Sequence, residues 1–161
     1  MSLQVKERLR IGILLLKKHK EKLKLITDIS VGDIYAESIL ITRDLHNDFA
    51  HLSGDDSPIH TSIEFAKRNG YQDCLGYAFL ITTLLSRIYG TKFPGGSELC
   101  LKQDCSFPAP YFVGDMLEFS ITVKSVNKPL KLMTATTVVL NNEQNVVFRG
   151  DVTFQLKLVN L

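Results

Sequence analysis

The sequence predicts a single α+β domain in which one antiparallel sheet wraps around one buried helix. Three observations support this fold class. Helical signals come early and a run of strand-like stretches follows them, which is the order typical of α+β domains. The segment 75–89 is apolar almost all round, as expected for a helix that is buried on every side. A chain of 161 residues with 45% hydrophobic and 22% charged residues can bury one sizeable core and suits one domain.

The first 26 residues form an extension ahead of a domain that we expect to span 27–161. Within them, residues 3–26 have the pattern of a basic amphipathic helix, since apolar residues recur on one face while lysines and arginines occupy the others. The apolar face would consist of Val5, Leu9, Ile13 and Leu16.

The segments that follow predict one strand and two short helices. Residues 33–42 alternate loosely and suit a strand, after which Thr42 can cap a short helix. That helix would carry inward Leu45, Phe49 and Leu52. A second short helix would end at Asn69-Gly70, a usual C-terminal signal. Its residues would include Ile63, Phe65 and Ala66.

Four strand-like stretches come after the buried helix, and two of them alternate cleanly. The first would point inward Leu117, Phe119, Ile121 and Val123. The second would point inward Val146, Phe148, Val152, Phe154 and Leu156. Turns at 127–129 and 141–142 separate the last three strands.

The charge pattern argues against a nucleic-acid-binding body. The total is only +2, but residues 1–24 hold 8 Lys/Arg against 2 Glu, whereas residues 25–161 hold 11 Lys/Arg against 15 Asp/Glu. A nucleic-acid-binding domain would need a basic face on the folded body rather than a local basic segment.

Cysteine usage and hydropathy bear on the compartment. Three cysteines without Cys-x-x-Cys or paired histidine spacing predict neither a disulfide framework nor a zinc site, which favours a reducing, cytoplasmic location. The longest early apolar run, 11–16, contains Gly12 and is followed at once by lysines. It predicts neither a signal peptide nor a membrane span.

The stretch 48–60 carries the strongest functional signal. Asp55 and His60 flank Ser57-Pro58, where the backbone is expected to turn. A carboxylate and an imidazole that converge on one point can take and give a proton in the same reaction. The structural alternatives are that Asp55 caps the following helix and that His60 is a hydrogen-bonded core histidine.

This stretch resembles the MaoC-like dehydratases, or (R)-specific enoyl-CoA hydratases, which have the hot-dog fold. The resemblance covers roughly residue 29 to the C-terminus and needs no gap between its blocks. The matching blocks are Phe49-Ala50, Leu52-Ser53-Gly54-Asp55, Pro58-Ile59-His60, Phe65-Ala66, Gly70-Tyr71 and Phe112-Val113-Gly114-Asp115.

The resemblance implies that Asp55 and His60 are the catalytic pair for hydration of a trans-2-enoyl thioester or the reverse dehydration. The family commonly has His-Gly at the start of the buried helix, where this chain has Tyr77-Ala78. The amide of Ala78 would still bind the thioester oxygen, while Tyr77 would alter the shape of the substrate site. Ser57 stands where some members have an asparagine that contacts the site.

The resemblance also implies a homodimer or higher homo-oligomer, a role in fatty acid metabolism, and no metal or redox cofactor. Coenzyme A or an acyl-carrier protein would enter only as the handle of the substrate. The basic extension would then lie against the domain or its dimer partner, or alternatively dock on an acidic carrier protein or an anionic membrane face.

Two other functions remain open at this stage. A hot-dog thioesterase would use the same fold and thioester pocket for hydrolysis, and a non-catalytic protein would bind acyl thioesters without turnover. No other catalytic motif competes: the stretch 93–97 indicates a surface connection rather than a phosphate-binding loop. His46 and His51 are expected on an exposed or half-buried helix face.

Overall fold

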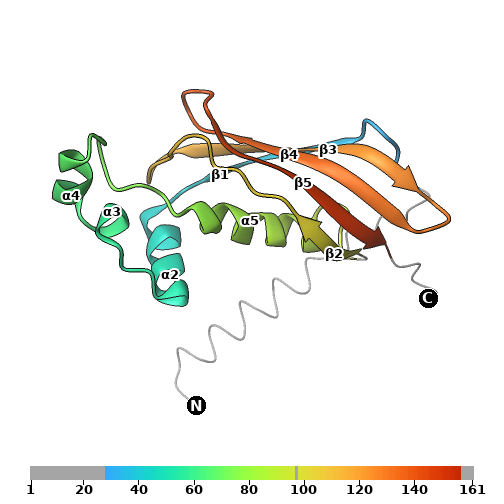
Figure 1. The fold of residues 1–161 in the computed structure, drawn as a ribbon, viewed down its shortest axis with the longest axis horizontal. Coiled ribbons are helices and arrows are strands. Elements are labelled where there is room, and N and C mark those ends of the chain that lie inside the picture. Colours follow the sequence, from blue (N-terminus) through green and yellow to red (C-terminus); the bar gives the residue numbers. More distant parts are fainter. Residues whose placement is uncertain (1–27, 97, 157–161) are drawn as a thin grey trace, which may run out of the picture.

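The computed structural model describes residues 28–96 and 98–156, so the predicted extension over residues 1–26 lies outside the described part. A curved antiparallel sheet arches over one long helix, α5 (Ala78–Thr91) (Figure 1). Helices α2 (Arg43–Ser53), α3 (Pro58–Thr61) and α4 (Ile63–Arg68) lie at the end of the molecule where α5 begins. This arrangement confirms the predicted α+β class and the hot-dog fold.

The sheet has five strands within the described residues, in the order β1-β3-β4-β5-β2. Their bounds are β1 Ile34–Leu40, β2 Glu98–Gln103, β3 Met116–Asn127, β4 Leu132–Leu140 and β5 Val146–Leu156. All neighbours pair antiparallel. Because β2 pairs with β5, it forms one edge of the sheet although it precedes β3 in the chain.

The core lies between α5 and the concave face of the sheet. Alternating residues of β3 are fully buried, as the sequence predicts: Leu117, Phe119, Ile121 and Val123. They face buried residues of α5, among them Leu80, Ile81, Leu84, Leu85 and Ile88. Burying each such side chain contributes about 1.5–3 kcal/mol to folding.

The alternation expected in β5 is wrong at its first residue. Val146 is only half-buried, whereas Val147 is buried together with Phe148. The register between β4 and β5 shifts between Val139 and Leu140, which pair with Phe148 and Val146. This bulge inserts one extra residue and reverses the facing of the strand before it, an effect that alternation alone does not reveal.

Two apolar residues expected inside are exposed. Phe79 is 65% exposed because the first turn of α5 extends toward the open end of the molecule, and α5 itself begins at Ala78 rather than at residue 75. Leu52 is 81% exposed because it lies in the last turn of α2 (Arg43–Ser53), beyond the elements against which that helix packs.

The helix ends follow the predicted signals. The hydroxyl of Thr42 accepts the N–H of Leu45 at 3.1 Å and caps α2. Helix α4 (Ile63–Arg68) ends at Asn69, and Gly70 follows with φ +86°, a conformation that favours glycine.

The turn expected at Ser57-Pro58 is a one-turn helix, α3 (Pro58–Thr61). Proline is tolerated there because the first N–H of a helix has no intrahelical partner.

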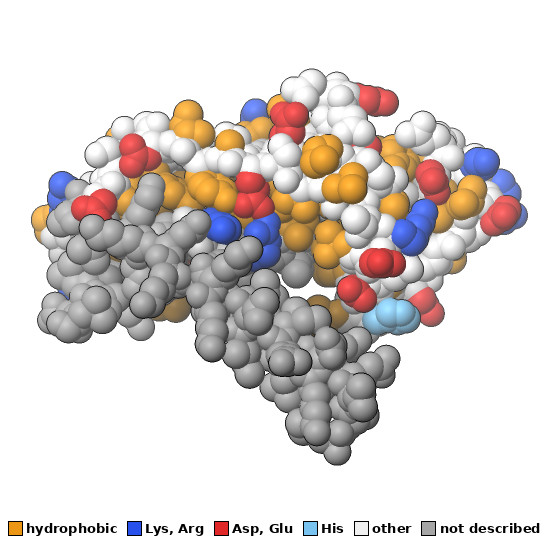
Figure 2. All heavy atoms as spheres, turned by 180° about the vertical axis from the view of Figure 1, so that it is seen from behind, with side chains coloured by type: hydrophobic (Ala, Val, Ile, Leu, Met, Phe, Trp, Pro, Cys, Tyr) orange, Lys and Arg blue, Asp and Glu red, His pale blue; other side chains and the backbone are white. Residues whose placement is uncertain are grey.

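Apolar side chains also reach the surface. Seen from behind, hydrophobic side chains are visible over the middle of the molecule (Figure 2). The stretch 93–97, expected at the surface, begins with Phe93, which is 1% exposed and stacks on Tyr35.

None of the helices in the described residues is long and apolar enough to cross a membrane.

Candidate active site

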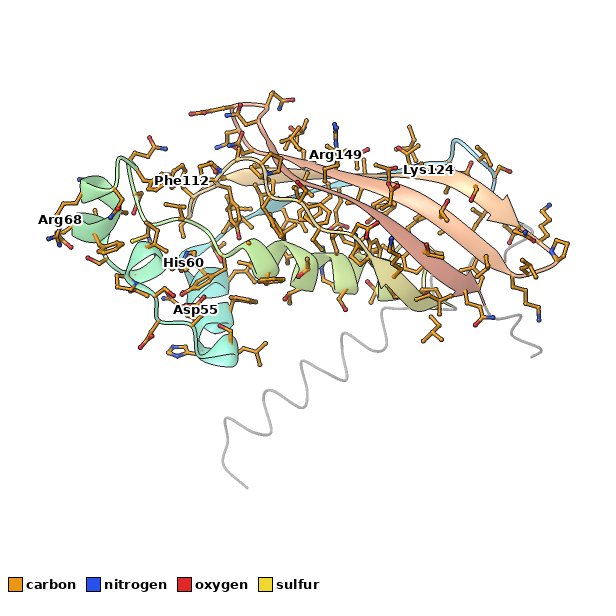
Figure 3. The ribbon with its side chains drawn as sticks, in the orientation of Figure 1. Asp55, His60, Arg68, Phe112, Lys124 and Arg149 are labelled. Atoms are coloured by element: carbon orange, nitrogen blue, oxygen red, sulfur yellow. The ribbon has the colours of Figure 1, made fainter. Side chains whose placement is uncertain are left out.

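Asp55 and His60 lie together at the end of the molecule where α5 begins (Figure 3). Asp55 follows Gly54, whose left-handed backbone, φ 72°, ends α2, and His60 lies in α3. Both residues line one cavity of about 450 Å³. The other residues of its lining are Phe49, Ser53, Tyr77, Ala78 and Phe79. The fold therefore brings four of the five predicted site residues to one cavity.

Ser57, the fifth predicted residue, binds Asp55 directly. Its hydroxyl and its backbone N–H both donate to Oδ1 of Asp55, the N–H at 3.1 Å. These two bonds, with a smaller contribution from the nearby His60, hold the pKa of Asp55 below its usual range. Asp55 is therefore ionised at neutral pH, and it does not cap α3, whose N-cap is Ser57.

His60 is oriented by the main chain. Its Nδ1 lies 2.9 Å from the carbonyl oxygen of Leu75. A carbonyl only accepts hydrogen bonds, so Nδ1 carries a proton in either charge state of the ring. Nε2 is then the atom that can take or give a proton in the cavity that the ring lines.

Ala78 offers a backbone N–H at the same place. It is the first residue of α5, and the first N–H groups of a helix have no intrahelical acceptor. A helix of 14 residues also carries partial positive charge at this end. The amide of Ala78 is thus suited to a developing oxyanion beside His60.

A second cavity, of about 340 Å³, meets the first at His60 and Ala78, which line both. Its wall is mainly apolar and includes Phe107 and the loop Pro108-Ala109-Pro110 that precedes β3. A long ligand could therefore occupy both cavities with its middle beside the imidazole.

Tyr77, predicted at the substrate site, is 2% exposed and contacts both members of the pair. Its hydroxyl donates to the backbone carbonyl of Asp55 at 2.9 Å, and its ring lies 4.2 Å from the His60 ring. Burial raises the pKa of its phenol, so Tyr77 remains a neutral donor.

The expectation that His46 is exposed or half-buried is wrong, because His46 is 2% exposed. Its ring lies 4.6 Å from the Tyr77 ring, and its Nε2 is 3.1 Å from the carbonyl oxygen of His60. His46 lies three residues before Phe49 on α2, and Phe49 also packs on Tyr77. The three-residue spacing from Phe49 puts His46 on the inner face of α2, and it is the signal in the sequence from which the burial could have been predicted.

The segment before α5 is fixed by a close contact with Tyr111. The N–H of Gly76 donates to the carbonyl of Tyr111 at 2.7 Å, and the Tyr111 hydroxyl donates to the carbonyl of Tyr77 at 2.6 Å. A Cβ on Gly76 would lie 2.1 Å from the Tyr111 ring, so only glycine fits there.

A curved sheet around one helix defines a hot-dog protein, and here a carboxylate and an imidazole lie beside the helix N-terminus. The profile of the MaoC like domain matches residues 29–147. The chain belongs to this family.

Several characterised proteins are similar to the chain. An (R)-specific enoyl-CoA hydratase of Aeromonas caviae is 28% identical over 108 residues, which cover 67% of this chain and 81% of that protein. A mitochondrial 3-hydroxyacyl-[acyl-carrier-protein] dehydratase of Arabidopsis thaliana is 25% identical over 130 residues, covering 79% and 77% of the two chains. The solved structure of an (R)-hydratase of A. caviae superposes with a TM-score of 0.75 at 26% identity, covering 80% of this chain and 98% of that one.

Proposed function

We propose that the chain hydrates trans-2-enoyl thioesters to (R)-3-hydroxyacyl thioesters and catalyses the reverse dehydration. The observation that carries this proposal is the shared cavity of Asp55 and His60 at the N-terminus of α5. The names of the relatives, hydratases and dehydratases of acyl thioesters, support the same reaction and make the chain a hydro-lyase.

In the proposed reaction a water molecule lies between the Asp55 carboxylate and Nε2 of His60. Asp55 takes a proton from the water as its oxygen bonds to the β-carbon, and the π electrons of the double bond move toward the thioester oxygen. Protonated His60 then gives its Nε2 proton to the α-carbon from the same face. Transfer of the proton from Asp55 to Nε2 restores the pair.

The thioester oxygen gains negative charge in this step, and we assign its stabilisation to the amide of Ala78. Removing one such donor from an enzyme commonly costs 10²–10³-fold in turnover. Tyr77 and Ser57 would shape the site by holding Asp55. The proposed reaction changes no oxidation state and both proton transfers come from the pair, so we propose that it uses no metal or redox cofactor, with coenzyme A or a carrier protein as the handle.

A homodimer joined along β2 fits the open edge of the sheet. Leu99 and Leu101 on this edge strand are 48% and 52% exposed, and unpaired strand edges readily pair with another chain. Structures of related folds include complexes of two different chains. We also propose a reducing, cytoplasmic location, which the free thiols of Cys74, Cys100 and Cys105 support.

The proposed activity is tested with crotonyl-CoA and a longer trans-2-enoyl-CoA, and with the same acyl groups on a carrier protein. Loss of the conjugated enoyl absorbance is the expected result, and chiral analysis should return the (R)-3-hydroxyacyl product. Release of free thiol would instead identify a thioesterase, and binding without turnover would identify a non-catalytic acyl-thioester-binding protein.

A further inference from the structure

We propose that Tyr77 and His46 are positioning residues, a pair with rings in contact that clamps the two ends of the turn carrying Asp55 and His60. The proposal rests on the proposed function; it adds His46 to the site and couples it to Tyr77 in one positioning role. Each of the two side chains binds the main chain of one member of the catalytic pair.

Tyr77 holds the Asp55 end. Its hydroxyl donates to the carbonyl of Asp55 across 22 residues of sequence, and its own carbonyl accepts the Tyr111 hydroxyl. Tyr77 is therefore held both at its hydroxyl and at its main chain. Because its ring also lies against the ring of His60, any tilt of Tyr77 would move both catalytic groups.

His46 holds the His60 end. Since the carbonyl of His60 only accepts, Nε2 of His46 must carry the proton that joins them. Nδ1 of His46 is then an unprotonated nitrogen, buried and without a hydrogen-bond partner among the described residues. A buried acceptor without a partner is costly, which indicates that this histidine serves the bond made by its other nitrogen.

The Tyr77 ring contacts the rings of both His46 and His60, with centroid separations of 4.6 and 4.2 Å and interplanar angles of 41° and 32°. The hydrogen bonds from Tyr77 and His46, here called the clamp bonds, end on the main-chain carbonyl oxygens of Asp55 and His60. They do not occupy the Asp55 carboxylate or Nε2 of His60, the groups that react. Loss of a clamp bond should therefore misplace the catalytic pair while leaving the binding surfaces for the thioester in place. The expected signature is a fall in kcat with little change in KM.

The test uses Tyr77→Phe and His46→Phe, which keep an aromatic ring at each position and remove the hydrogen-bond donor. Each should lower kcat for enoyl-CoA hydration about ten-fold, with KM changed by less than about two-fold. His46→Gln, whose side-chain amide can still donate to the carbonyl of His60, should recover most of the loss. Tyr35→Phe removes a hydroxyl bond to Glu37 on β1, away from the site, and serves as the matched control.

A second measurement does not depend on turnover. The imidazole NMR signals of His60, assigned by their loss in His60→Gln, should broaden or divide in Tyr77→Phe and His46→Phe but not in Tyr35→Phe. Unchanged kcat and unchanged His60 signals in both clamp variants would overturn the proposal. So would equal losses in His46→Gln and His46→Phe accompanied by a lower melting temperature, since that pattern marks a packing role. If the wild-type protein hydrates no enoyl thioester, the proposed function fails while the NMR signals still decide on the clamp.

Discussion

At the scale of single residues, the proposed mechanism requires different protonation roles for Asp55 and His60. Ser57 stabilises the ionised form of Asp55 by two hydrogen bonds. The carbonyl of Leu75 fixes the proton of His60 on Nδ1 and directs the exchangeable proton to Nε2. These hydrogen bonds support the proposed division of the proton transfers between the two groups.

Asp55→Asn and His60→Gln keep approximate size and remove the proton chemistry. Each should lower turnover about 10²-fold or more, and the double variant should be little worse than the worse single one because the two groups act as a unit. Steady-state hydration kinetics and thermal melts measure both effects. A large fall in melting temperature with activity retained per folded molecule would assign both residues to structural roles instead.

Ser57→Ala should change the pH dependence of the reaction. The Ser57 hydroxyl is the main cause that lowers the pKa of Asp55, so its loss lets that pKa rise toward the usual value. Because Asp55 must be ionised to accept the proton of water, the acid limb of kcat/KM should move to higher pH. Ser38→Ala on the exposed side of β1 is the control. If the acid limb of kcat/KM lies at the same pH in both variants, Ser57 does not have this role.

At the scale of elements, helix α5 contributes both its apolar body to the core and its N-terminus to the site. Tyr77 at the N-cap has an extended backbone, φ −74° and ψ 125°, and Ala78 is the first helical residue. Proline is well suited to that first position and to an extended preceding residue. A proline at position 78 would therefore remove the backbone N–H of that residue and still allow the helix to form.

Ala78→Pro removes the amide assigned to the oxyanion and keeps the start of the helix. Turnover should fall about 10²–10³-fold, with a far-ultraviolet circular dichroism spectrum like that of the wild-type protein. Ala78→Ser retains the amide and is the matched control. Full activity in a folded proline variant would show that another group binds the thioester oxygen.

At the scale of the whole molecule, we expect the buried His46 to make the stability of the fold depend on pH. Burial, aided by the charges of Arg43 and His60, lowers the pKa of His46 despite its bond to a carbonyl and the opposing charge of Asp73. In the unfolded chain the same ring has its ordinary pKa, near 6.5. The folded state therefore binds fewer protons than the unfolded state just below that pH.

Stability should accordingly fall as the pH drops below about 6.5. Thermal melts across the range from about pH 8 to about pH 5 should show a declining melting temperature, and His46→Phe should weaken the decline. His51→Phe, at an exposed position on α2, is the control. An identical pH dependence in wild-type protein and His46→Phe would show that other groups govern acid stability.

The edge strand β2 should determine the oligomeric state. Leu101→Arg places a charge on the proposed dimer edge and should shift the protein to a monomer in sedimentation or light scattering. Leu130→Arg, at a 59% exposed position between β3 and β4, should leave the mass unchanged. A dimer that persists in Leu101→Arg would locate the interface elsewhere.

The sequence by itself determined the fold class, several helix and strand positions, and the segment that carries the proposed catalytic pair. The apolar run of α5, the alternation of β3 and the signals at Thr42 and Gly70 act locally, so they could be recognised before the structure was known. The pattern around Asp55 and His60 pointed to one cavity for the same reason, since both residues lie on one short segment.

Only the tertiary structure decided what surrounds that segment. The roles of Tyr77 and His46 depend on contacts between residues 14 to 22 positions apart in sequence, and the exposure of Leu52 depends on where its neighbours end. The bulge that buries Val147 depends on the register between two strands. Local propensity cannot encode such effects, because each is set by packing between elements that meet only when the chain has folded.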